Sequence, residues 1–220
     1  MARQLIINFH GVGSCERAFE PNEEIVWVKE QLLRSLLEAI AAQEDVVVTV
    51  DDGNSSDHAI VLPLLQTLGM KARFFVLMNK LDKPGYLTRQ QVKELSVAGM
   101  IVGLHGRDHV DWRRLDDTRL REETKDAKRD LEDLLGTEVT EASCPFGSYD
   151  RRVLRSLRDA GYERVYTSDR GYADTQCWLL PRNTIHGSDS LATLEAMIDT
   201  GWPILKRLAM GTRRCLKRWR

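Results

Sequence analysis

The sequence contains no apolar run of the about 18–20 residues that a membrane-spanning helix needs. We also expect no secretory leader, because MARQLIINFHGVG has one charge, a short apolar run and no small-residue cleavage site. We therefore expect a cytoplasmic protein, either free or peripheral on the inner face of the membrane.

Closely spaced cysteine pairs are missing too. The four cysteines include no CxxC motif; they are Cys15, Cys144, Cys177 and Cys215. Without a secretory signal, this spacing predicts free thiols rather than a disulfide framework.

Repeats and Gly/Ser-rich linkers are absent from 1–199, and acidic residues are absent after Thr200. The chain has 220 residues, of which 42% are hydrophobic and 30% charged, as in a soluble globular protein with a core. Seven basic residues follow Thr200, so the net charge of −1 leaves −8 for the rest. We predict one domain at 1–199 and a basic tail at 200–220, and the acidic body argues against nucleic acid as a partner.

The tail alternates its cations with apolar residues, among them Trp202 and Trp219. A basic amphipathic segment with tryptophan is typical of contact with an anionic membrane surface. A solvated tail, or a helix docked on the acidic body, remains open as an alternative.

Short β-like runs alternate with stretches of helical periodicity along the body. The run DVVVTV at 45–50 is apolar almost throughout, which favours a strand covered on both faces. Strands are predicted at 4–9, 45–50, 72–78, 100–104, 139–143, 162–168 and near 178–185. Helices are predicted at 25–42, from 55–57 to 68, at 88–99, 117–135 and 150–161, and from about 190.

This alternation predicts an α/β fold with a parallel sheet, either open or closed into a barrel. In both cases the functional residues belong at the carboxyl ends of the strands. Seven polar residues and one aromatic residue follow the predicted strands: His10, Asp51, Asp52, His105, His109, Phe146, Asp169 and His186. Four of the five histidines are in this set, which a random surface distribution would not produce.

Asp52, His105 and His109 are suitable ligands for a divalent cation, since catalytic zinc takes three nitrogen or oxygen ligands and keeps one open position. His105 and His109 are four residues apart, so one helical turn would bring both rings to one side. Asp51 is then free to act as a base. Taken alone, DDG is more often a turn and HxxxH a solvated helix face.

Several motifs together resemble the polysaccharide deacetylases of carbohydrate esterase family 4, which include the nodulation-factor chitooligosaccharide deacetylases. They are VTVDDG (48–53), IVLPLLQTLGMKARFFV (60–76), LHGRDH (104–109), CPFGSYD (144–150), YTSD (166–169) and TIH (184–186). The resemblance covers roughly 45–190. It implies a single-domain distorted (β/α)7 barrel that hydrolyses an acetyl group, N-linked by preference, on an oligo- or polysaccharide or its lipid-linked precursor, as in exopolysaccharide biosynthesis.

The resemblance also implies roles for individual residues. Asp51 would be the general base, the backbone N–H of Phe146 would bind the oxyanion, and His186 would protonate the leaving amine. Asp52, His105 and His109 would hold one divalent ion, Zn²⁺ by preference, with Co²⁺, Ni²⁺ or Mn²⁺ as alternatives.

Three positions depart from the family pattern. Ser143 stands where an arginine usually orients the catalytic aspartate, and we predict that Arg182 supplies the guanidinium instead. Tyr172 and Ala173 replace the aspartate and tryptophan of the fourth motif, so Trp178 is a candidate for the acetyl-pocket wall. Only the histidine of the fifth motif is kept. Cleft-lining or supporting roles are predicted for His10, Arg182, Asp169 and Tyr149.

Two other functions are compatible with these motifs. The first is a degenerate relative that binds a glycan, or acts as a scaffold in polysaccharide synthesis, without turnover. The complete set of Asp51, Asp52, His105 and His109 argues against it. The second is a deformylase of a lipid-linked amino sugar, which the motifs do not distinguish from a deacetylase.

Overall fold

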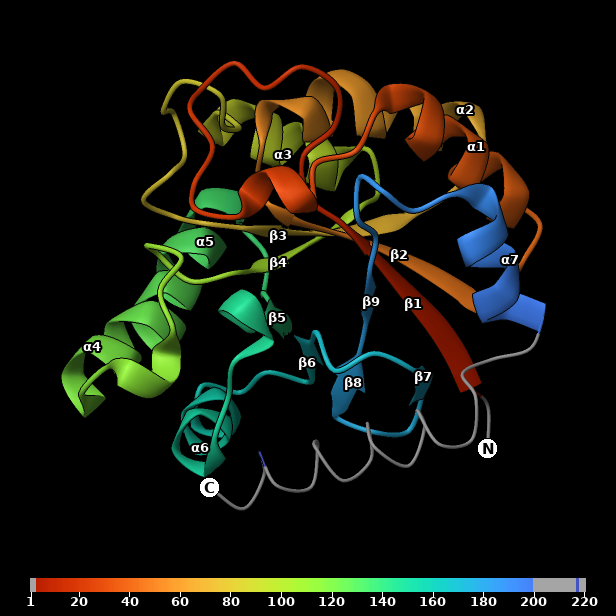
Figure 1. Ribbon diagram of the computed structural model, residues 1–220. Helices are drawn as coiled ribbons and strands as arrows, with labels where there is room; N and C mark the ends of the chain where they lie inside the picture. Colours follow the sequence, from red (N-terminus) through yellow and green to blue (C-terminus); the bar gives the residue numbers. More distant parts are fainter. Residues whose placement is uncertain (1–2, 200–216, 218–220) are drawn as a thin grey trace.

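The computed structural model describes residues 3–199 and Lys217 (Figure 1). Its strands are β1 (Arg3–Phe9), β2 (Val46–Asp52), β3 (Ala72–Val76), β4 (Ile101–Leu104), β5 (Glu141–Ser143), β6 (Arg164–Thr167), β7 (Tyr172–Asp174), β8 (Leu179–Pro181) and β9 (Asn183–Thr184). Its α-helices are α1 (Glu30–Ile40), α2 (Leu62–Thr67), α3 (Arg89–Val97), α4 (Asp117–Arg121), α5 (Ala127–Leu135), α6 (Arg151–Asp159) and α7 (Leu191–Asp199).

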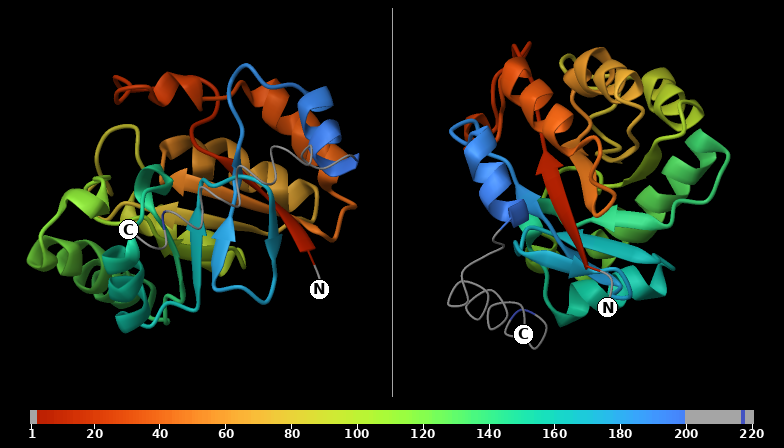
Figure 2. Two further views of the ribbon diagram at one scale, coloured as in Figure 1. Left: turned by 60° about the horizontal axis from the view of Figure 1, so that its bottom comes forward. Right: turned by 90° about the vertical axis from the view of Figure 1, so that its right-hand side faces the viewer.

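The strands form one sheet in the order β7-β1-β2-β3-β4-β5-β6-β8, with β9 on β1. All pairs are parallel except β1 with β7. The segment from β8 to β9 passes from β6 to β1 and so nearly closes the sheet, while the helices surround it (Figure 2). The fold is therefore the expected distorted (β/α)7 barrel rather than an open sheet.

The two faces of the strands bury different kinds of side chains. Leu5, Ile7 and Phe9 of β1 point outward into the main core beneath the helices. The barrel interior contains a small apolar cluster made of Ile6, Phe75, Tyr166, Ala173 and Leu180. Polar residues fill the interior next to this cluster, and they include Asn8, Thr49, Asp51, Ser143 and Arg182. Because side chains alternate along a strand, the apolar and polar interior layers follow from the sequence of each strand.

Several elements differ from the predictions. The helix expected at 25–42 begins only at Glu30, because Lys29 is extended and Val28 forms a β-bridge with Val12. The strand expected near 178–185 is divided at Arg182 into β8 and β9. The sequence analysis missed β7, which is three residues long.

The predicted tail, 200–220, lies outside the described residues except for Lys217. The ammonium group of Lys217 is 2.6 Å from Oδ1 of Asp169 and donates to the carbonyl oxygen of Gly147 at 3.1 Å. Among the described residues, none of the helices is both long and apolar enough to cross a membrane.

Candidate active site

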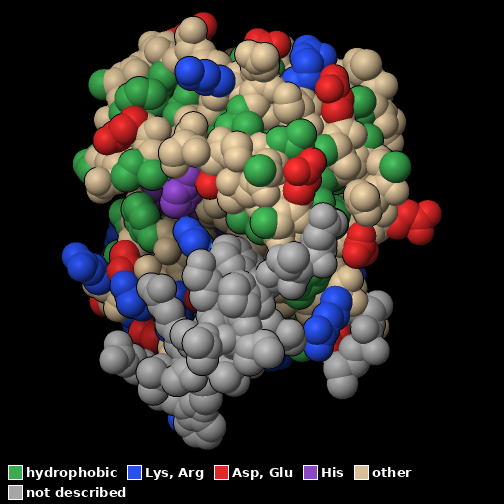
Figure 3. Space-filling model, turned by 45° about the vertical axis from the view of Figure 1, so that its right-hand side comes forward, with side chains coloured by type: hydrophobic (Ala, Val, Ile, Leu, Met, Phe, Trp, Pro, Cys, Tyr) green, Lys and Arg blue, Asp and Glu red, His purple; other side chains and the backbone are tan. Residues whose placement is uncertain are grey.

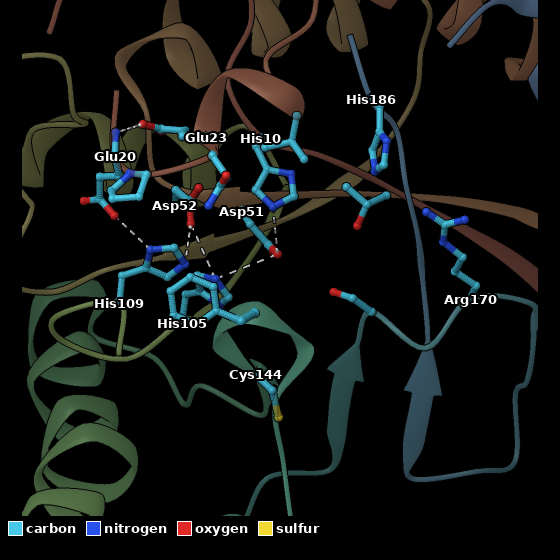
Figure 4. Close-up of a pocket in the computed structure, with 16 residues that line it drawn as sticks. His10, Glu20, Glu23, Asp51, Asp52, His105, His109, Cys144, Arg170 and His186 are labelled. Atoms are coloured by element: carbon cyan, nitrogen blue, oxygen red, sulfur yellow. Dashed lines mark hydrogen bonds and ion pairs between the residues drawn. The ribbon is translucent and has the colours of Figure 1, made fainter. Parts of the chain in front are cut away.

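A cavity of about 560 Å³ opens at the carboxyl ends of the strands. Its ionisable lining includes His10, Glu20, Glu23, Asp51, Asp52, His105, His109, Arg170 and His186 (Figure 4). On the molecular surface, histidine (purple) is visible in a hollow bordered by hydrophobic side chains (Figure 3). The residues predicted from the strand ends thus gather at one opening of the barrel.

Asp52, His105 and His109 form a compact cluster whose ligand atoms lie within 4.8 Å of one another. Nε2 of His105 is 3.4 Å, and Nε2 of His109 is 3.7 Å, from Oδ1 of Asp52. This buried Oδ1 has no hydrogen-bond partner among the described residues. Two ring nitrogens facing an unpartnered carboxylate oxygen fit a divalent cation with three protein ligands.

Local backbone conformation brings these ligands together. Asp52 has φ 78° and His109 has φ 54°, values in the left-handed region that side-chain-bearing residues rarely adopt. At Asp52 this conformation ends the alternation of β2, so that Asp51 faces the barrel interior while Asp52 faces the histidines. Such strain is typical of functional sites.

Each imidazole is oriented by an oxygen behind it. Nδ1 of His105 donates to the carbonyl oxygen of Ser143 at 2.9 Å, and Nδ1 of His109 to Oε2 of Glu20 at 3.1 Å. In the neutral form of each ring, Nε2 then carries the lone pair and is directed toward Asp52.

Electrostatics differ between the two rings. Burial lowers the pKa of His105, despite the charges of Asp51 and Asp52. Burial also opposes the charged form of His109, but its hydrogen bond with Glu20 and the charge of Asp52 outweigh burial and raise its pKa. The hydrogen bond with His109, together with Lys80, holds the pKa of Glu20 well below its usual range.

Arg182 binds Asp51 in the interior of the barrel. Its two terminal nitrogens lie 2.8 Å from Oδ1 and 2.7 Å from Oδ2 of Asp51, and its side chain is fully buried. The contact predicted between these residues is therefore present. Burial alone would raise the pKa of Asp51, but the charges of Arg182 and His105 hold it well below its usual range.

Small polar residues complete this buried network. Arg182 donates to Oδ1 of Asn8 at 2.8 Å and to Oγ of Ser143 at 2.6 Å, and Asn8 donates to Asp51 at 3.1 Å. Thr49 donates to Asn8 at 2.7 Å. Ser143, where the resemblance leads us to expect an arginine, thus contacts an arginine that arrives from the segment between β8 and β9.

Two further histidines face the cavity. Nε2 of His10 is 4.0 Å from Oδ2 of Asp51, and its buried Nδ1 has no hydrogen-bond partner among the described residues. His186 lies across the cavity, on the side of Arg170 (Figure 4). Both histidines are thus placed where the sequence analysis expected them, on the cavity wall.

The turn after β5 carries Phe146, whose ring stacks on His109 with the centroids 4.3 Å apart. Phe146 is 60% exposed and has φ 57°. Asp169 and Tyr149 are buried behind this turn, where the Tyr149 hydroxyl donates to Oδ2 of Asp169 at 2.6 Å. They are not among the described residues that line the cavity, so they support the wall from behind.

Trp178 was wrongly assigned to the acetyl pocket. It precedes β8, and its indole N–H donates to the carbonyl oxygen of Tyr162 at 2.6 Å while Arg158 stacks on its ring. It lies at the amino end of its strand, whereas the cavity is at the carboxyl ends.

The sequence analysis missed Glu20 and Asn8 as site residues. Glu20 belongs to the long segment between β1 and α1, where no periodicity indicates which side chains face inward. Asn8 is the penultimate residue of β1, and its inward orientation follows from alternation with Ile7. That alternation was the only signal available for it.

The sequence profile of the family described as polysaccharide deacetylase matches residues 39–165. The chain belongs to this family. Polysaccharide deacetylases are hydrolases that cleave the amide bond of acetylated sugars, and the family depends on metal. The Asp52, His105 and His109 cluster is a candidate site for such an ion.

Individual relatives agree with this assignment. A protein of Bacillus subtilis (strain 168), named as the polysaccharide deacetylase YxkH, is 25% identical over 215 residues, or 90% of this chain and 77% of its own length. The peptidoglycan-N-acetylglucosamine deacetylase of Bacillus cereus is 27% identical over 62% of this chain and 61% of its own length.

Solved structures support the fold. The Streptococcus pyogenes deacetylase PplD, solved in complex with acetate, superposes with a TM-score of 0.78 at 20% identity, over 90% of this chain and 98% of that one. The de-N-acetylase of Aggregatibacter actinomycetemcomitans gives a TM-score of 0.75 at 14% identity, over 89% and 100% of the two chains.

Proposed function

We propose that this polysaccharide deacetylase removes N-acetyl groups from a sugar of an oligo- or polysaccharide, or of its lipid-linked precursor, with the help of a divalent cation. The observation that carries the proposal is the pairing of two adjacent carboxylates with different partners. Asp52 faces His105 and His109, whereas Asp51 is held by Arg182. One carboxylate is therefore available to a cation and the other to a proton.

Asp51 is suited to the role of general base. Its ion pair with Arg182 keeps it ionised, and two hydrogen bonds fix its orientation. It lies next to the metal cluster, with Oδ2 3.9 Å from Nε2 of His105. From this position Asp51 takes a proton from the water that attacks the acetyl carbonyl.

Asp52, His105 and His109 would hold the proposed cation. This nitrogen-rich ligand set suits Zn²⁺, with Co²⁺, Ni²⁺ and Mn²⁺ as alternatives. When bound, the cation would polarise the acetyl carbonyl and acidify the attacking water. The backbone N–H of Phe146 is proposed to donate to the oxyanion, which is the position where negative charge develops.

A histidine of the cavity must protonate the leaving amine, because an unprotonated amine is a poor leaving group. His186 is the residue predicted from the sequence for this role. His10 is a second candidate, favoured by its position 4.0 Å from Asp51 and by its unpartnered Nδ1. Comparing His186→Gln with His10→Gln separates the two, because only the true donor should lose activity toward amide substrates while keeping it toward an activated acetyl ester.

The ionised, arginine-bound Asp51 also supports catalysis over a non-catalytic glycan-binding role. A protein that only binds sugar would gain nothing from such a buried ion pair, because the desolvation of the two charges can cost more than their attraction returns.

The decisive experiment measures acetate and formate release from N-acetylated, O-acetylated and N-formylated oligosaccharides. The protein is first stripped with a chelator, and assays are run with and without added Zn²⁺, Co²⁺, Ni²⁺ or Mn²⁺. We expect acetate from the N-acetylated substrates only after a cation is restored. Cation-independent release, or none from any substrate, would contradict the proposal.

We also propose that the basic tail brings this enzyme to an anionic membrane surface, in keeping with a cytoplasmic enzyme that acts on membrane-bound glycan precursors. Seven cations and two tryptophans after Thr200 support this role.

A further inference from the structure

Glu20 lies outside every motif that links this chain to its family, yet it contacts His109 of the candidate metal site. It belongs to the segment between β1 and α1, and its side chain reaches across the cavity wall to His109 (Figure 4). The contact joins residues 89 positions apart in the sequence.

We propose that Glu20 is a positioning residue for the metal site, which accepts the Nδ1–H of His109 and so keeps Nε2 of that ring directed at Asp52. This inference rests on the proposed metal-dependent function. It concerns a carboxylate behind a ligand histidine, an arrangement that fixes the tautomer and strengthens the ligand.

The two ligand histidines are supported in different ways. His105 donates to the backbone carbonyl of Ser143, which no side-chain substitution removes. His109 donates to a side chain, and its backbone is in the strained left-handed region. The hydrogen bond that orients His109 therefore comes from a side chain that a substitution can remove.

Glu20 is itself held in place by neighbouring loops. Its Oε1 accepts from Lys80 at 2.7 Å and from the Tyr86 hydroxyl at 3.2 Å, which leaves Oε2 for His109. Its backbone N–H donates to Glu23 at 2.8 Å. Lys80 and Tyr86 lie in the connection after β3, so the carboxylate is fixed before any cation arrives.

A second set of contacts connects the segment between β1 and α1 to the loop that follows Asp52. Arg17 binds Glu23 through both terminal nitrogens and donates to Oδ1 of Asn54 at 2.7 Å. Asn54 is two residues after the ligand Asp52. The segment between β1 and α1 therefore contacts His109 directly through Glu20 and contacts the loop that follows Asp52 through Arg17.

The test compares Glu20→Ala and Glu20→Gln with the wild type in cation affinity, measured by competition with a chromophoric chelator for Zn²⁺ and Co²⁺. We expect Glu20→Ala to weaken affinity about 10–100-fold. The cation affinity of Glu20→Gln should lie between those of Glu20→Ala and the wild type, because its amide oxygen can still accept the Nδ1–H. Glu24→Gln, a substitution of an exposed glutamate four residues away, is the matched control and should bind as the wild type does.

A second measurement needs neither metal nor activity. The ¹⁵N chemical shifts of the His109 ring in metal-free protein report its tautomer and should show a proton on Nδ1 in the wild type and a tautomer mixture in Glu20→Ala at a pH where the ring is neutral. Equal affinity and an unchanged tautomer in Glu20→Ala would overturn the inference. A wild type that binds no cation would contradict the proposed function instead, and the tautomer would still decide the role of Glu20.

Discussion

Asp51, Asp52 and Asp57 are close in the sequence and have three different electrostatic environments. Asp51 is bound by a guanidinium, Asp52 faces two imidazoles, and Asp57 is fully buried next to the charges of the other two. Position along one short loop therefore does not define the chemistry of a carboxylate; the groups that arrive from other strands do.

For Asp51→Asn we expect retained cation binding and a fall in kcat of at least about 10²–10⁴-fold, the usual contribution of general acid–base catalysis. The reason is the proposed division of roles, in which Asp51 takes the proton and Asp52 faces the cation. Chelator competition and acetate release measure the two properties separately. If cation binding disappears together with activity, the two aspartates have been assigned in the wrong order.

For Arg182→Met we expect a loss of about 3–5 kcal/mol in the free energy of unfolding, because it leaves the buried charge of Asp51 unpaired. Adding Asp51→Asn to this variant removes the orphaned charge, so the double variant should be more stable than the two single effects predict. Urea unfolding of all four proteins measures the coupling. Additive effects would show that the two side chains do not stabilise one another.

Asp57 should make the stability of the metal-free protein fall as pH rises. Burial and the charge of Asp52 raise the pKa of Asp57 well above its ordinary value. Above about pH 4 the unfolded chain loses this proton while the folded chain keeps it, which lowers the free energy of unfolding by about 1.4 kcal/mol per pH unit until the raised pKa is reached.

Asp57→Asn removes this dependence. The stability of the variant relative to the wild type should therefore increase between pH 4.5 and pH 7, as measured by chemical unfolding in the presence of a chelator. An equal difference at both pH values would mean that Asp57 is ionised in the folded protein.

The grouping of Asp52, His105 and His109 could be predicted from the sequence because Asp52 ends β2, both histidines come soon after β4, and parallel strands share one carboxyl edge. Arg182 could be predicted because the family's arginine was missing at Ser143 and another strand end carried one. Glu20 could not be predicted, because its contact with His109 depends on the path of an irregular segment. Trp178 was assigned to the wrong end of its strand, because the sequence does not distinguish the start of a short strand from its end.

At the scale of elements, irregular backbone accounts for most of the differences from prediction. The amphipathic pattern at 25–42 is real, but Ile25 ends a separate 3-10 turn and Val28 pairs with Val12, so the α-helix begins only at Glu30. The run near 178–185 reads as one strand because β8 and β9 are continuous in sequence, although they pair with different neighbours. Pairing partners are set by barrel closure, which local propensity does not encode.

Close packing between β4 and β5 provides a test at this scale. A Cβ on Gly103 of β4 would lie 2.7 Å from the backbone oxygen of Glu141 and 2.6 Å from the ring of Phe75. We expect Gly103→Ala to separate these strands and lower the free energy of unfolding by about 1–3 kcal/mol. Because His105 follows two residues later, cation affinity should fall as well.

Gly69→Ala is the matched control for this strand variant. A Cβ there would meet nothing within 4 Å, so only its left-handed backbone, φ 65°, is penalised, by about 1–2 kcal/mol. Cation affinity should not change. If Gly103→Ala also leaves cation affinity unchanged, the spacing of β4 and β5 does not control the position of His105.

At the scale of the whole molecule, the acidic body and the basic tail are the main asymmetry. We expect a chain ending at Thr200 to lose salt-sensitive sedimentation with anionic vesicles, because basic residues near such a surface contribute about 1 kcal/mol each. Turnover of a soluble substrate should be unchanged. A full-length protein that ignores anionic vesicles at low salt would contradict the membrane role.

Lys217→Met provides the control for truncation. It removes the contact with Asp169 and only one of the seven tail cations, so vesicle binding should largely persist. If turnover falls in both Lys217→Met and the truncated protein, the contact between Lys217 and Asp169 supports the turn that carries Phe146, and the tail contributes to the chemistry.

The division of one segment into β8 and β9 at Arg182 has a consequence for how the protein is made. Asn8 and Arg182, which meet in the finished barrel, are 174 residues apart. At about 5–20 residues per second, a ribosome adds the arginine roughly 9–35 s after the asparagine. Until then Asp51 has no guanidinium, and sealing the barrel around a lone carboxylate would be strongly unfavourable. The last step of barrel closure therefore also supplies the ion-pair partner of Asp51, the proposed base, so a nascent chain that stops short of Arg182 has neither a closed fold nor this ion pair.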